Sequence, residues 1–147
     1  MAVNSSRPAA QLDATVDATA LFHRGAVEGC LGHWQSARRC FAAAAQARPG
    51  FTQARCNAAL ISLQLGELEQ AEAELRSLLR RYPLLAEARA GLTALLCSRG
   101  NLAEALGQWH ATTRLDPRYR QRDWLLQNRR WPPLPLQALE PLLALVD

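Results

Sequence analysis

The chain contains no lysine, so all 17 of its basic residues are arginine. Valine, isoleucine and threonine are scarce, and the predominance of alanine and leucine favours helices over sheets. No apolar run approaches the ~18 residues of a membrane-spanning helix. The N-terminal stretch also lacks the charged segment and apolar core of a secretory signal. We therefore expect a soluble, cytoplasmic, all-α protein.

Motifs typical of catalysis and metal binding are also absent. None of the four cysteines belongs to a CxxC pair. His23, Cys30, His33 and Cys40 lie close in sequence but lack the spacing of a zinc site. No serine lies in a GxSxG motif, and no glycine-rich phosphate loop occurs. We therefore predict a protein that is not an enzyme and that needs no metal or cofactor.

An internal repeat organises the middle of the chain. Shifting the sequence by 34 residues aligns the segments 18–51, 52–85 and 86–119 without a gap. Each segment has a glycine suited to the end of a first helix, small and large apolar residues in a second helix, and a proline that ends it. These columns are Gly32, Gly66 and Gly100; Ala37, Ala71 and Ala105; Phe41, Leu75 and Trp109; and Pro49, Pro83 and Pro117.

Each unit is therefore predicted to form a helix, a glycine turn, a second helix and a proline turn. The predicted helices are 18–31, 34–47, 52–65, 68–81, 86–99 and 102–115, followed by a seventh over 119–130. Residues 1–17 are predicted to be a flexible N-terminal arm. The tail after Trp131 is rich in proline, and a short apolar helix is expected from about Leu136.

The second-helix segments carry a family resemblance. LGHWQSARRCFAAAAQARP, LGELEQAEAELRSLLRRYP and RGNLAEALGQWHATTRLDP resemble tetratricopeptide repeats (TPRs) in their small, aromatic and terminal-proline positions. The resemblance implies a right-handed α-solenoid of three helix–turn–helix units, with a partner bound in a concave groove formed by the first helices. It is weaker in those first helices, where Leu21, Arg55 and Arg89 replace the usual large aromatic residue.

The resemblance also indicates which residues would line the groove. They are mostly small and uncharged, which suits an extended peptide or an amphipathic helix. The candidates are His23, Ala26, Cys30, Gln53, Asn57, Leu60, Gln64, Glu87, Gly91, Ala94 and Ser98. Two alternatives are open: several of these residues pack between helices, or the C-terminal tail itself occupies the groove.

One variant of the family is excluded by the residues present. Members that bind chaperone tails use a clamp of basic and amide side chains, and only Asn57 matches that clamp. Phe22, Glu87 and Gly91 stand where basic residues are expected. We therefore do not expect binding to the C-terminal carboxylate of a chaperone.

Residues 120–147 are predicted to cap the solenoid, because solenoid ends expose apolar faces. The segment carries eight large apolar residues: Trp124, Leu125, Leu126, Trp131, Leu136, Leu139, Leu142 and Leu143. A docking helix for a partner is the alternative interpretation of the same residues.

An arginine-rich patch precedes this tail. It consists of Arg114, Arg118, Arg120, Arg122, Arg129 and Arg130. Such a patch is either a solvated face or a contact for an acidic protein surface, which would raise the rate of association. The sequence thus predicts an adaptor or assembly factor that binds another protein. The alternative is an RNA-associated repeat protein, because tyrosine and tryptophan are interleaved with these arginines.

Overall fold

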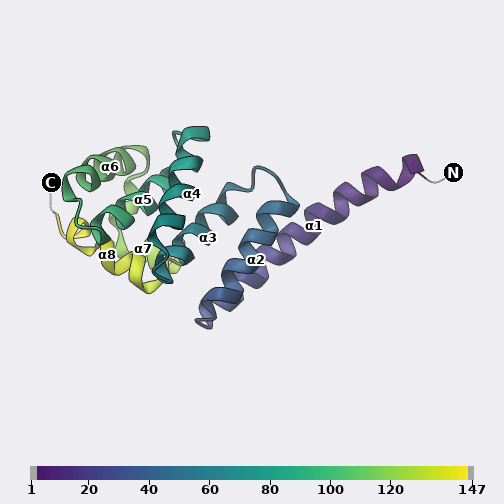
Figure 1. The fold of residues 1–147 in the computed structure, drawn as a ribbon, viewed down its shortest axis with the longest axis horizontal. Helices are drawn as coiled ribbons and strands as arrows, with labels where there is room; N and C mark the ends of the chain where they lie inside the picture. The colour runs from purple at the N-terminus through teal and green to yellow at the C-terminus, as the bar shows by residue number, and fades with distance from the viewer. Residues whose placement is uncertain (1–2, 146–147) are drawn as a thin grey trace. The chain divides into compact units, whose positions relative to one another are not determined.

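The computed structural model describes residues 3–145, with side chains described from residue 17 onward. Within this range all regular elements are helical (Figure 1). They are α1 (Val3–Cys30), α2 (Trp34–Ala47), α3 (Thr52–Gln64), α4 (Leu68–Arg81), α5 (Ala86–Ser98), α6 (Leu102–Leu115), the 3₁₀ helix η1 (Pro117–Arg120), α7 (Arg122–Gln127) and α8 (Pro133–Leu143). None of these helices combines the length and hydrophobicity that a membrane span requires.

The contacts between residues divide the chain into two compact units. Unit 1 is Met1–Ala58 and unit 2 is Ala59–Asp147, so the division falls within α3. Each unit is described by itself below.

The six repeat helices confirm the prediction, with α2, α4 and α6 ending where the sequence places them. Each glycine turn is a Schellman motif, in which the glycine takes a positive φ and the next N–H bonds five residues back. Gly32, Gly66 and Gly100 have φ values of 76°, 80° and 77°. The N–H groups of His33, Glu67 and Asn101 bond to the carbonyls of Glu28, Ser62 and Leu96, each at 2.9 Å.

Two predicted elements differ from the structure. Helix α1 begins at Val3, so it extends through most of the segment predicted to be an arm. The helix predicted over 119–130 is instead η1 followed by α7, separated by the extended Gln121 (φ −97°, ψ 107°). Asp116 caps η1 by accepting the Arg118 N–H at 3.1 Å, and Pro117 begins it. Asp116 and Pro117 thus determine where η1 begins, and the extended Gln121 interrupts the helix predicted over 119–130.

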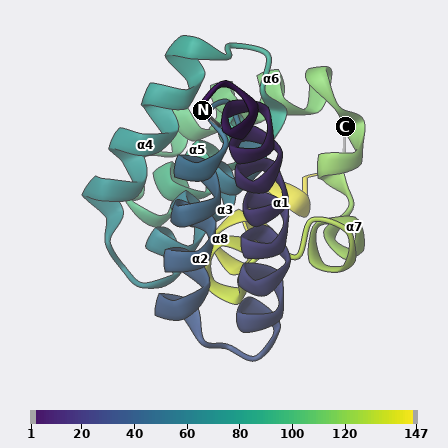
Figure 2. The same ribbon diagram turned by 90° about the vertical axis from the view of Figure 1, so that its right-hand side faces the viewer.

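In unit 1, α1 and α2 pack side by side (Figures 1 and 2). Phe22 of α1 joins the helices through an edge contact with Phe41 of α2, with ring centres 5.2 Å apart. It also stacks on Phe51, just before α3, at 5.1 Å. The guanidinium of Arg48 lies 3.7 Å from the centre of the Phe51 ring. This aromatic cluster therefore fixes the start of α3 beside α1.

Gly25 makes the close approach of α1 and α2 possible. A Cβ at Gly25 would lie 2.9 Å from Cε1 of Phe41, a ring that is itself buried. We expect Gly25→Ala to cost about 1–3 kcal/mol in the free energy of unfolding, because the ring cannot move away without strain. Urea unfolding followed by circular dichroism measures the effect.

Gly29→Ala is the matched control for this prediction. It lies on the same helix, and its Cβ would meet Trp34 at an ordinary 3.8 Å. Alanine should therefore stabilise α1 there by up to about 1 kcal/mol. Equal effects of the two substitutions would contradict the close-contact argument.

In unit 2, α5 is the central helix and packs against α4, α6 and α8. Arg89 occupies the position where the resemblance leads one to expect an aromatic residue. Its guanidinium donates to the Pro83 carbonyl at 2.7 Å and to the Gln108 side chain at 2.8 Å. The arginine thus joins the turn before α5 to α6 by hydrogen bonds.

A chain of ion pairs connects three helices of unit 2. Arg76 of α4 contacts Glu72 at 2.9 Å and Glu104 of α6 at 3.0 Å. Glu72 also contacts Arg99, which follows α5, at 3.4 Å. Asn101 is the N-cap of α6, since its side chain accepts the N–H of Glu104 at 3.4 Å.

Candidate functional site

The predicted groove positions of unit 1 are accessible. His23 and Cys30 of α1 and Gln53 of α3 are exposed, and Ala26 and Asn57 are half-buried. Val27 of α1 and Leu31, directly after the end of α1, are 57% and 63% exposed. The stack of Phe22 on Phe51 brings α1 and the start of α3 together. Unit 1 therefore presents an uncharged, partly apolar face, which we call the α1 face.

The predicted groove positions of unit 2 are mostly buried. Leu60 is 2% exposed, and Gly91 and Ala94 are buried as well. A Cβ at Gly91 would lie 3.4 Å from Leu60 and 3.0 Å from Leu75. Leu60 and Gly91 therefore face each other between helices. Ser98 is exposed and donates to the Ala94 carbonyl of its own helix at 3.1 Å.

The C-terminal helix α8 packs on α5. Leu136, Leu139 and Leu142 of α8 are buried, with Leu139 fully so. At the start of α8 the Leu134 N–H donates to the side chain of Gln64, a predicted groove residue, at 2.7 Å. In unit 2 the chain's own tail thus covers α5 on the side where a groove ligand was predicted.

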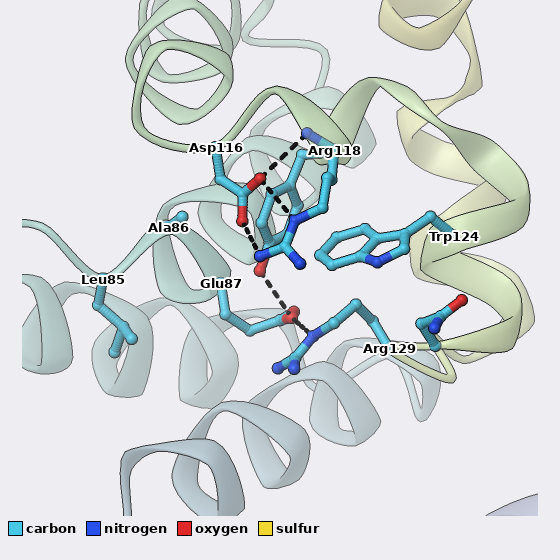
Figure 3. Close-up of a pocket in the computed structure, with 9 residues that line it drawn as sticks. Leu85, Ala86, Glu87, Asp116, Arg118, Trp124 and Arg129 are labelled. Atoms are coloured by element: carbon cyan, nitrogen blue, oxygen red, sulfur yellow. Dashed lines mark hydrogen bonds and ion pairs between the residues drawn. The ribbon is translucent and has the colours of Figure 1, made fainter.

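Glu87, also a predicted groove residue, is the centre of a buried hydrogen-bond network (Figure 3). Its Oε1 accepts from the Tyr119 hydroxyl at 3.0 Å and from Nε of Arg129 at 2.6 Å. Its Oε2 accepts from Nε1 of Trp131 at 2.8 Å. Because Glu87 is only 5% exposed, these donors compensate the cost of burying its charge.

A pocket of about 430 Å³ adjoins this network. Asp116, Arg118, Trp124 and Asn128 line it together with Glu87 (Figure 3). Arg118 makes a two-point contact with Asp116, at 3.0 and 2.8 Å, and its guanidinium lies 4.8 Å from the Trp124 ring centre. The hydrogen bonds from Arg118 hold the pKa of Asp116 below its ordinary value. Asp116 therefore supports the folded state at neutral pH, and this support is lost only as the pH falls through the lowered pKa.

The arginine patch does not form one continuous stripe, because Arg118 and Arg122 lie on different helices. Arg118 is paired with Asp116, Arg122 with Glu140 at 3.1 Å, and Arg129 with Glu87. Arg114, Arg120 and Arg130 are exposed. The pairing lowers the net charge that the patch can offer to an acidic surface or a phosphate.

Among the residues with described side chains, no three His, Cys, Asp or Glu side chains gather closely enough to hold a metal ion. The histidine and cysteine cluster noted in the sequence is separated. Nδ1 of His33 lies 2.8 Å from Glu28, Cys30 is exposed, and Cys40 is buried.

The antiparallel helix pairs, the glycine turns and the 34-residue register define a tetratricopeptide-type α-solenoid. Comparison with solved structures bears this out. The crystal structure of YrrB, a TPR protein with an unusual peptide-binding site, matches 84% of this chain with a TM-score of 0.56 and 22% sequence identity. The chain spans 66% of the length of the YrrB chain. The sequence matches no protein-family model and no curated protein.

Proposed function

We propose that this chain is a protein-interaction scaffold, an adaptor or assembly factor, that binds a partner peptide or helix on the α1 face. The observation that carries the proposal is the contrast between the two units. The groove positions of unit 1 are accessible, whereas those of unit 2, apart from the exposed Ser98, are buried or contact the start of α8. The peptide-binding site of YrrB, a protein of the same fold, supports a ligand of this kind.

The composition of the α1 face favours a partner with apolar side chains. Val27 and Leu31 are large apolar groups in water, and burying both would contribute to binding. Gln53 and Asn57 offer amide donors and acceptors, which suit the backbone of an extended peptide or the polar flank of a helix. No acidic residue belongs to the predicted groove positions of this unit.

The exposed thiol of Cys30 allows a direct test. A photo-activatable cross-linker attached to Cys30 should capture the partner from the native cell, and mass spectrometry then maps the cross-linked peptide. Cys40 and Cys56 are buried, and burial raises the pKa of the Cys97 thiol, so Cys30 should be labelled first. A synthetic copy of the mapped peptide then permits a titration by fluorescence anisotropy.

In that titration, Asn57→Arg should weaken binding at least about tenfold, since a long charged side chain would enter a small uncharged face. Gln46→Arg is the matched control, because Gln46 is exposed on α2 of the same unit and lies outside the predicted groove. Unchanged affinity of the folded Asn57→Arg variant would rule out the α1 face as the binding site.

A further inference from the structure

The helix that covers α5 has the properties of a bound ligand. We propose that the covered face of α5 is a second interaction surface, on which α8 is exchanged for a partner helix of the same chemistry. That chemistry is a leucine-rich helix preceded by an arginine and a tryptophan. This surface lies in unit 2 and does not depend on binding at the α1 face.

The apolar part of this chemistry comes from α8 itself. Leu136, Leu139 and Leu142 are spaced at i, i+3 and i+6, which places them along one side of a helix. The helix α5 beneath is rich in buried small residues, among them Ala90 and Ala94, so a neighbouring helix can approach closely. A competing helix needs the same spacing of aliphatic side chains.

The polar part is set by Glu87. Two of its three donors, Arg129 and Trp131, belong to the segment that leads into α8, whereas Tyr119 belongs to η1. If α8 leaves together with this segment, Glu87 loses two of its hydrogen-bond donors. The exposed carboxylate would then select a replacement that carries a guanidinium or an indole N–H.

The link to α8 has the features of a hinge. Arg130 has a positive φ of 53°, a conformation that costs a non-glycine residue on the order of 1–2 kcal/mol. Pro132 and Pro133 follow, and neither has an N–H to hold the backbone in place. Release of α8 would relieve the strain at Arg130.

Helix α8 is also weak by itself. It contains only 11 residues, with Pro141 inside it, so it lacks a helical hydrogen bond. Its helical form therefore depends on the surface it covers. A segment of this kind opens as a unit at a lower free energy than the core beneath it.

Hydrogen–deuterium exchange of the full-length protein tests the exchange of α8 without any substitution. Amides of α8 should exchange at least about tenfold faster than the buried amides of α5 under native conditions. The α8 protection should also depend little on low denaturant concentrations. Exchange of both helices only through one common unfolding event would overturn the proposal.

A synthetic peptide that copies residues 129–145 tests the chemistry of the surface. In Leu139→Asp, the chain's own α8 should bind poorly, so the labelled peptide should bind this full-length variant at least about tenfold more tightly than the parent. A peptide in which leucine replaces Arg129 and phenylalanine replaces Trp131 should bind at least about tenfold more weakly, because it cannot donate to Glu87.

Each other outcome of the peptide experiment argues against the proposal. Equal affinities of the two peptides would show that Glu87 does not contribute to recognition of the ligand. The Leu139→Asp variant could unfold, and α5 and α8 of the parent could exchange their amides in one common event. These two results together would show that α8 is a fixed part of the fold. A parent protein that dimerises by exchanging α8 would make a second copy the occupant instead. None of these results bears on the α1 face, which is tested with different residues and a different ligand.

Discussion

Glu87→Ala should lower the free energy of unfolding by about 3–5 kcal/mol, a large part of the stability of a domain of this size. The substitution removes the only acceptor that the structure shows for the indole N–H of Trp131, and it separates Arg129 from its ion-pair partner. Both side chains are buried or largely buried, so water does not readily replace the lost carboxylate. Urea unfolding followed by tryptophan fluorescence measures the loss.

Two further variants make this prediction specific. Glu87→Gln keeps one acceptor oxygen but loses the charge and the second acceptor, so its cost should be smaller than that of Glu87→Ala, at about 1–3 kcal/mol. Glu140→Ala removes another acid paired with an arginine, but that pair is exposed and should be worth less than about 1 kcal/mol. A cost for Glu87→Ala as small as that for Glu140→Ala would show that the network does not stabilise the fold.

Leu60→Arg should destabilise unit 2 by more than about 4 kcal/mol, because it places a charge between packed helices. Leu60 is 2% exposed, and its side chain faces Gly91 and the neighbouring Leu75. We expect loss of helical signal at physiological temperature, measured by circular dichroism. The substitution therefore tests the core and cannot be used to test ligand binding.

Gln53→Arg provides the control on the same helix. Gln53 is exposed near the start of α3, so the same new side chain should change stability by no more than about 0.5 kcal/mol. A folded, stable Leu60→Arg protein would mean that Leu60 can turn outward, and would restore it as a candidate ligand contact.

The repeat helices could be predicted almost to the residue because local chemistry determines their ends. A glycine such as Gly66 takes the positive φ that closes a Schellman motif, and a proline such as Pro83 cannot continue the preceding helix. Both signals act within a few residues of the boundary. Their recurrence at a fixed spacing made the fold class predictable as well.

Which of the predicted groove positions are accessible and which are buried could not be predicted from such local signals. Whether Leu60 faces a ligand or a neighbouring helix depends on the rotation of α3 and on which segment covers it, and neither leaves a local signal. The partners of Glu87 lie 32 to 44 residues away in sequence. An acid within the apolar stretch after Leu85, and a tryptophan within a proline-rich tail, were the visible but ambiguous traces of this network.

The arginine patch shows a related limit. Arg118 and Arg122 are four residues apart and would share a face of one continuous helix, but η1 ends at Arg120 and the extended Gln121 separates it from α7. The short-range contact of Arg118 with Asp116 determines where its charge lies. Helical periodicity alone therefore gave the wrong arrangement where turn chemistry interrupts the helix.

The ion pairs that join Arg99, Glu72, Arg76 and Glu104 connect the second repeat to the third. In a linear array, cooperativity is the coupling energy between neighbours, and it decides whether the repeats melt together or one after another. Part of this coupling energy is electrostatic. The ion pairs that supply it are partly exposed to solvent, so dissolved salt weakens them. The apolar contacts between the same helices carry no such dependence. The salt concentration therefore influences how many repeats unfold in one step.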